Sequence, residues 1–193
     1  MITTELISSW IWRKNLKIEK IITHKDYCIA HQNNHDIALL KLQERLDLST
    51  YTPACLPEQA AKFTGRTASV YGWGNEEPPT PPGCSITRFP DPPQSPVLRE
   101  TKLTIIDNSE CKQSSGTVPW CVVNPVTMGE KDVSYQDRIF DDMICAYKKG
   151  TDSCQGDSGG PLSVEEDGGR HTLVGVVSFG EDCARVSCAS WHW

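Results

Sequence analysis

The chain has 193 residues, of which 38% are hydrophobic, enough to bury the core of one large domain or of two small packed lobes. Its net charge of −6 argues against a nucleic-acid-binding protein, which normally presents a basic face. No apolar run approaches the length that spans a bilayer and no signal peptide is evident, so we expect no membrane association and a secretion signal, if any, upstream of Met1 or lost.

Five short apolar segments are predicted to be β-strands, because turn-forming residues separate them and their composition is rich in β-branched residues. In chain order they are Ile18–Ile22, Ile37–Leu42, Ala68–Tyr71, Leu103–Ile106 and Leu173–Phe179. Residues 2–16 fit either a helix or a strand, and no long segment has a helical period. Short strands in this number favour a β-sandwich or barrel over alternating strands and helices.

Two stretches between the predicted strands are expected to be long surface loops. Residues 75–96 contain eight prolines, which remove backbone donors and do not occur in central strands. Residues 112–141 are polar and show no clear alternation. We therefore expect a β scaffold that carries two large insertions.

Nine cysteines are scattered along the chain, and none of them forms a Cys-x-x-Cys pair. This pattern favours disulfides and an oxidising compartment over a zinc ribbon. Because the count is odd, at least one thiol is free or bonded outside this chain.

The strongest motif is the run DSCQGDSGGPL, from Asp152 to Leu162. A serine hydroxyl needs a base to become a nucleophile, and the oxyanion that forms on attack needs donors already in place. The glycines allow a sharp turn, which makes the amides of Gly156 and Ser158 natural donors. An α/β-hydrolase elbow would need a helix after the serine, but here a polar loop after Pro161 leads to the strand Leu173–Phe179.

The run resembles the active-site segment of the chymotrypsin/trypsin-like serine peptidases. That resemblance implies Ser158 as the nucleophile and the N–H groups of Gly156 and Ser158 as the oxyanion hole. It also implies that Asp152 lies at the base of a pocket that binds Lys or Arg of a protein or peptide substrate. Asp157 would pair with a new Ile or Val amino terminus, which the start of this chain does not supply.

Further segments resemble the same family in the same order. The segment HDIALLKL makes Asp36 the carboxylate that orients the catalytic imidazole, with His35 where the family usually has Asn. Val177–Gly180 resembles the strand on which the substrate backbone lies, so Ser178 and Gly180 are expected to border the pocket. The fold implied is all-β, two packed antiparallel six-stranded barrels, with the first barrel and the C-terminal end incomplete.

The expected organisation is a single peptidase domain over 1–193. Residues 1–57 would be the remnant of the first barrel, 58–185 the second barrel with the loops 75–96 and 112–141, and 186–193 an atypical tail that leaves out the last strand. The resemblance pairs Cys111 with Cys145 and Cys154 with Cys183, and assigns Cys55 to a bond with an upstream chain. Ala68 and Val164 stand where many members have a bridged pair. Four cysteines are left unassigned: Cys28, Cys84, Cys121 and Cys188.

The chain departs from the family at the catalytic base, since it contains no Ala-Ala-His-Cys segment before Asp36. None of the five histidines is expected to take its place: His24, His31, His35, His171 and His192. His35 directly precedes Asp36, and neighbouring side chains on a strand point to opposite faces, so His35 is badly placed to bridge Asp36 and Ser158. His31 and His35 have the spacing of a helical metal pair but lack the Glu of the zinc-peptidase motif, so they are interpreted as loop residues.

Three interpretations follow. In the first, the chain is a truncated form of a secreted, extracellular endopeptidase that cleaves after Lys or Arg and needs no cofactor or metal, and it is inactive as given. In the second, it is a non-catalytic homologue that binds or regulates partners. In the third, it is an active enzyme with a different base, which the triad chemistry disfavours because removal of one member leaves only residual catalysis.

Overall fold

The computed structural model of the chain describes residues 15–27, 33–77, 93–122, 127–180, 183 and 189–192. The elements are β1 (Ile18–Thr23), β2 (Ala38–Leu42), β3 (Thr67–Gly72), β4 (Arg99–Ile106), α1 (Asn108–Gln113), β5 (Ser115–Val122), β6 (Thr127–Ser134), β7 (Met143–Tyr147), β8 (Pro161–Glu166), β9 (Arg170–Gly180) and β10 (Ala189–His192). All five predicted strands are present within about four residues of their expected ends, and the predicted all-β class is confirmed.

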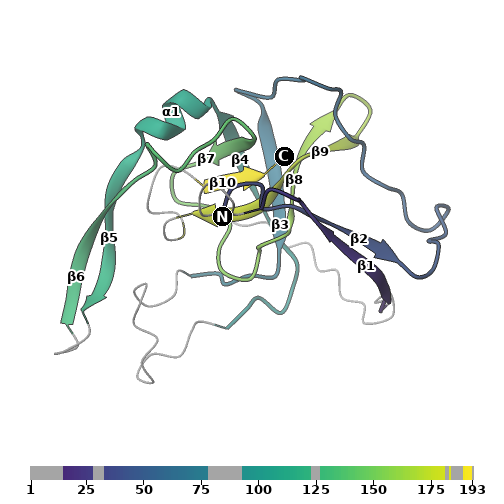
Figure 1. The fold of residues 1–193 in the computed structure, drawn as a ribbon, viewed down its shortest axis with the longest axis horizontal. Helices are drawn as coiled ribbons and strands as arrows, with labels where there is room; N and C mark the ends of the chain where they lie inside the picture. The colour runs from purple at the N-terminus through teal and green to yellow at the C-terminus, as the bar shows by residue number, and fades with distance from the viewer. Residues whose placement is uncertain are drawn as a thin grey trace.

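Six strands close into an antiparallel barrel in the order β10-β7-β4-β3-β8-β9 (Figure 1). This confirms the second six-stranded barrel that the resemblance implied. Alternate residues of its strands fill the interior, as the two-residue period of a strand requires. The barrel core is apolar and consists of Ala68, Val70, Leu103, Ile105, Ala146, Leu162, Val164 and Val174.

Ala68 on β3 and Val164 on β8 are both buried in this core. These are the two positions at which many members of the resembled family have cysteines. β3 and β8 pair directly next to them, with Ser69 opposite Ser163. Apolar contact thus fills the place of a cross-link between these two strands.

β1 and β2 form a separate two-stranded antiparallel sheet. Its aliphatic side chains are largely open to solvent, with Ile21 61% and Leu39 67% exposed. In the view of Figure 1 this hairpin extends from the barrel on the side opposite to β5 and β6. In the part of the chain where the first barrel was predicted, the described residues form these two strands.

The expectation of a surface loop over 112–141 is wrong. α1 continues to Gln113, and β5 and β6 then form a hairpin from Ser115↔Ser134 to Val122↔Thr127. Neither strand pairs with the barrel, and Figure 1 shows the hairpin projecting from it. Alternation predicts strands where one face packs along its length on a core, and these two strands pair only with each other.

Two further expectations are corrected. The polar loop expected after Pro161 is strand β8, Pro161–Glu166, whose Leu162 and Val164 are fully buried. The atypical tail does not leave the last strand out: Ala189–His192 form β10, which pairs with β7 and β9 and closes the barrel. Closure pairs the backbone groups that two edge strands would otherwise expose, a gain that requires no particular sequence.

The proline-rich loop over 75–96 falls largely outside the described residues. Its two ends are held together, since Asn75 pairs with Gln94 in an isolated antiparallel bridge. The ambiguous segment 2–16 likewise lies almost wholly outside the described part of the chain.

Candidate active site

Ser158 lies on an exposed turn directly before β8. The turn is tied together by a hydrogen bond from the Asp157 amide to the Cys154 carbonyl at 3.0 Å. It is tied to β9 by a bond from the Gly159 amide to the Val177 carbonyl at 2.9 Å. Gly156 has φ +97°, a left-handed backbone that a side chain would strain. The glycines of the motif therefore let the chain present Ser158 at the end of the barrel.

The Gly156 and Ser158 amides donate to no acceptor within the part of the chain that the structure describes. Unpaired amides next to an exposed hydroxyl are the donor set that a developing oxyanion requires. Both residues were predicted for this role from the motif. Their oxyanion role stays a prediction, which the geometry permits.

Asp157 is held by two backbone amides. Its Oδ1 accepts from Gly74 at 2.7 Å, and its Oδ2 accepts from Cys154 at 2.9 Å. A Cβ at Gly72 would overlap the Asp157 carboxylate, so the absence of a side chain at that position makes room for it. A cavity of about 130 Å³ lies beside Asp157 and extends to Asp152. Asp157 thus faces a space that could admit a small cationic group.

A pocket of about 220 Å³ lies next to Ser158. It is lined by Asp152, Ser153, Cys154, Gln155, Ser158, Val177, Ser178, Phe179, Gly180 and Cys183. The structure thereby brings together four residues that the sequence placed at the site from two separate segments: Asp152, Ser158, Ser178 and Gly180. A carboxylate in a pocket beside a nucleophile provides a binding partner for a cationic side chain.

Asp36 reaches this region from the other sheet. It directly precedes Ile37, the residue before β2. Its Oδ2 accepts a hydrogen bond from Ser178 Oγ at 2.8 Å. Ser178 also lines the pocket that contains Ser158. One side chain therefore connects the predicted triad aspartate with the predicted nucleophile's pocket. Residues 142 positions apart leave no local signal in the sequence, so this bond was not predicted.

The histidines whose side chains are described make their contacts elsewhere. His24 Nδ1 accepts from the Asp26 amide, His35 Nδ1 lies 2.8 Å from Asp142 Oδ2, and His171 Nδ1 lies 3.4 Å from Ser163 Oγ. Ser158 has no imidazole partner among the described residues. His31 and the side chain of His192 lie outside the described set. The arrangement thus brings together the predicted nucleophile, two unpaired amides and the predicted binding carboxylate, and no described imidazole lies beside Ser158.

Both disulfides implied by the resemblance are present. Cys111 on α1 is bonded to Cys145 on β7, with a Cα–Cα distance of 6.3 Å. Cys154 is bonded to Cys183 with a Cα–Cα distance of 5.2 Å, and this bond borders the pocket. Among the described cysteines, Cys55 is unbonded and exposed. The side chains of the four unassigned cysteines lie outside the described set.

One cluster of chemically capable side chains was missed from the sequence. His24, Asp26 and His35 lie within reach of one another, although the sequence analysis interpreted both histidines separately. The pairing of the predicted strands Ile18–Ile22 and Ile37–Leu42 as a hairpin would have indicated it, since the residues that follow the first strand then lie beside those that precede the second.

No helix among the described residues is both long and apolar enough to cross a bilayer.

Comparison with known proteins agrees with this geometry. The model of the trypsin family matches residues 7–190. The chain is 38% identical to a mouse tryptase over 176 residues, which are 88% of this chain and 55% of that protein. It is 35% identical to the Drosophila melanogaster serine protease filzig over 89% of this chain and 8% of that protein. It is 33% identical to the clotting factor G beta subunit of Tachypleus tridentatus over 89% and 50%. The chain thus spans about half or less of the length of these relatives.

Proposed function

Because the chain belongs to the trypsin family, we propose that it is a serine-type endopeptidase domain that cleaves proteins after lysine or arginine through an acyl-enzyme on Ser158. The observation that carries the proposal is the single pocket that contains Asp152 together with Ser158, Ser178 and Gly180. A substrate cation bound to Asp152 would place the next peptide carbonyl near the Ser158 hydroxyl and the free amides of Gly156 and Ser158.

In the proposed reaction the Ser158 oxygen bonds to the carbonyl carbon while a base takes its proton. The oxyanion is held by the Gly156 and Ser158 amides, and the leaving amine departs with the proton. Water then attacks the acyl-enzyme in the same way and releases the acid. Asp36 would orient the base, and its bond from Ser178 fixes the carboxylate for that purpose. None of the histidine side chains that the structure describes contacts Ser158. We therefore expect the 193-residue chain to show no more than residual turnover.

Asp157 is proposed as the acceptor for an ammonium terminus released by activation cleavage. Support comes from the hydrogen bonds that two backbone amides donate to its carboxylate and from the cavity beside it. Binding of an ammonium group to Asp157 would shift the backbone amides of Gly156 and Ser158, which flank Asp157 in the same turn.

We further propose an extracellular location, which two disulfides favour. Cys55 is proposed to bond an upstream segment, since it is exposed and unbonded among the described cysteines.

The test separates the pocket from the chemistry. A fluorescent arylamidine should bind the 193-residue chain, and Asp152→Asn should weaken that binding by at least about tenfold, because a charge-assisted bond is lost. Asp167→Asn, on the turn after β8, is the matched control and should bind like the parent. If a neutral aryl analogue binds equally well, the proposed specificity is wrong.

Catalysis needs its own measurement. A longer chain that includes a family-type histidine segment should cleave an arginine peptide over a leucine peptide, and Ser158→Ala should abolish the cleavage. If the longer chain binds the arylamidine but fails to cleave, the second function is favoured: a non-catalytic homologue that binds cationic segments of partner proteins. The lack of a described imidazole beside Ser158 is what favours this alternative.

A further inference from the structure

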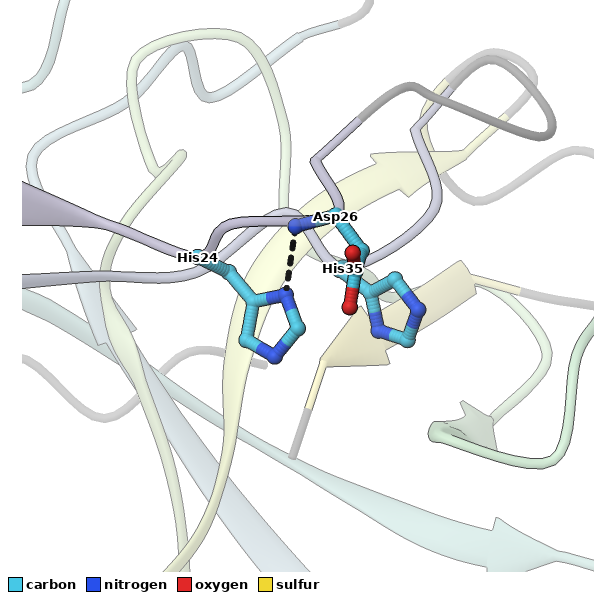
Figure 2. Close-up of side chains that lie close together, drawn as sticks. All are labelled: His24, Asp26 and His35. Atoms are coloured by element: carbon cyan, nitrogen blue, oxygen red, sulfur yellow. Dashed lines mark hydrogen bonds between the residues drawn. The ribbon is translucent and has the colours of Figure 1, made fainter.

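The ends of β1 and β2 bring three metal-binding residue types together outside the peptidase pocket. His24 follows β1, and its amide donates to the Ile37 carbonyl at 3.1 Å, next to the Thr23↔Ala38 pair. His35 lies three residues before the start of β2. The two imidazoles stack with ring centroids 4.5 Å apart, and Asp26 lies beside them (Figure 2).

We propose that His24, Asp26 and His35 bind one divalent transition-metal ion, with zinc as the best match. One ligand atom from each residue lies within 4.8 Å of the other two. Two imidazoles and a carboxylate are a donor set that zinc uses in sites with a fourth, exchangeable position. Zinc also imposes no geometric preference of its own, which suits a half-buried site. Ligand atoms around tetrahedral zinc lie about 3.3 Å apart, so side-chain rotations need to close the set by at most about 1.5 Å.

The surroundings of His35 already resemble those of a metal ligand. Its Nδ1 lies 2.8 Å from Asp142 Oδ2, a contact that places a proton on Nδ1 and leaves Nε2 free to coordinate. Metal-bound histidines usually donate their second ring nitrogen to a carboxylate in this way, which fixes the ring and raises its basicity. Asp142 is thus a positioning residue for the proposed site.

The groups that compete with the ion are weak. Asp26 has Lys25 as a cationic neighbour at 3.9 Å, and the lysine side chain is 86% exposed. His24 Nδ1 accepts a 3.2 Å bond from the Asp26 amide, drawn dashed in Figure 2. A neutral imidazole holds one proton, so coordination through either ring nitrogen of His24 ends this bond. The ion therefore displaces one long hydrogen bond and one exposed lysine.

Bound metal would link the end of β1 to the residue that directly precedes Asp36. Because Asp36 is held by Ser178, the ion would restrain the segment that carries the proposed triad aspartate. The metal site does not rest on the proposed peptidase function, and the test below measures metal binding alone.

The test uses the full chain without a histidine tag, with free thiols alkylated under non-reducing conditions so that Cys55 cannot bind metal. Zinc sulfate is titrated against a chromophoric chelator. We expect one zinc per chain, and at least tenfold weaker binding in each of His24→Gln, Asp26→Asn and His35→Asn. Asp142→Asn should also weaken binding, by about tenfold or more. His171→Gln is the matched control and should bind like the parent.

Two features keep the test decisive if a variant folds poorly. His35 has φ 53°, a left-handed conformation that asparagine also adopts readily, so His35→Asn should retain the fold by near-UV circular dichroism. In the unmutated chain, zinc should slow carbethoxylation of His24 and His35, read by mass spectrometry, and leave His171 unchanged. Equal zinc affinity in folded His35→Asn, or equal modification rates with and without zinc, would overturn the proposal.

Discussion

The closed barrel and the β1–β2 hairpin are built from the same kinds of residue, yet their side chains end in opposite environments. Leu103 and Ile105 on β4 are 1% and 2% exposed, whereas Leu39 and Leu40 on β2 are 67% and 56% exposed. Each barrel strand has a neighbour on both sides, while β1 and β2 have only each other. Similar composition thus gives strands in both regions, and these aliphatic side chains are buried where each strand has two neighbours.

The largest consequence of this difference should appear in hydrogen exchange. Barrel amides such as those of Val70 and Leu103 should open only with global unfolding, whereas those of Ile21 and Ile22 open locally. We expect protection factors at least about a thousandfold higher in the barrel, because a two-stranded sheet is marginal in water. Equal protection, read by mass spectrometry after short digestion, would show that the hairpin shares the barrel's cooperative unit.

A matched pair of leucine truncations sharpens the same comparison. Leu103→Ala should lower the free energy of unfolding by about 2–5 kcal/mol, because it removes a buried side chain and leaves a cavity. Leu40→Ala should change it by no more than about 0.5 kcal/mol, because more than half of that residue is exposed in the folded state. Urea midpoints measure both. A large loss in Leu40→Ala would indicate that β2 packs against something that covers it in solution.

A second pair of variants tests whether the tight packing of the barrel extends to the turn that carries Asp157. Gly72→Ala should cost about 1–3 kcal/mol, because the added Cβ overlaps the Asp157 carboxylate. Asp157→Ala removes that carboxylate, so the double variant should lose less stability than the two single losses combined. Strict additivity in urea denaturation would mean that the cost of Gly72→Ala does not come from the Asp157 carboxylate.

The smallest expected effect is on the loss of folding stability at low pH. Hydrogen bonds from the Ser109 hydroxyl and amide hold the pKa of Asp107, the N-cap of α1, below its ordinary 3.8. A folded-state pKa below the unfolded one gives stability that is present above pH 3.8 and is lost as the pH falls through the folded value. Asp107→Asn keeps a capping oxygen but does not titrate, so its stability should fall less than the parent's between about pH 5 and 2.

Asp47 provides the control for that experiment on the hairpin side of the molecule. Its pKa is also lowered, by bonds from the Ser49 hydroxyl and amide and from Thr50. If the barrel alone sets the global stability, Asp47→Asn should leave the acid profile of urea midpoints unchanged. A flattening equal to that of Asp107→Asn would place the hairpin side within the same folding unit.

The sequence predicted three of the six barrel strands, β3, β4 and β9, and missed β7, β8 and β10, although β7 and β8 each have a buried face. Leu103–Ile106 is visible because β4 packs on the core, whereas β5 and β6 pair only with each other and carry no alternation. β10 closes the barrel through backbone pairing, which four residues of almost any composition can make.

Predictability of the site divides in a similar way. The pocket residues were found because a long motif fixes Asp152 and Ser158 within seven positions of each other. The Ser178–Asp36 bond and the His24–Asp26–His35 cluster depend on which strands pair. Strand pairing is a property of the whole topology, so no local window of the sequence contains it.

The two disulfides differ in what a reductant can reach. Cys111 and Cys145 are both fully buried in an apolar cluster with Tyr135 and Ile139. Cys154 is only partly buried, and its bond to Cys183 borders the pocket of Asp152 and Ser158. Thiol–disulfide exchange requires access to a sulfur, so Cys154–Cys183 is the bond that yields first. A mildly reducing environment would then disable the pocket while the barrel remained folded, which makes loss of ligand binding the earlier sign of redox damage in this protein.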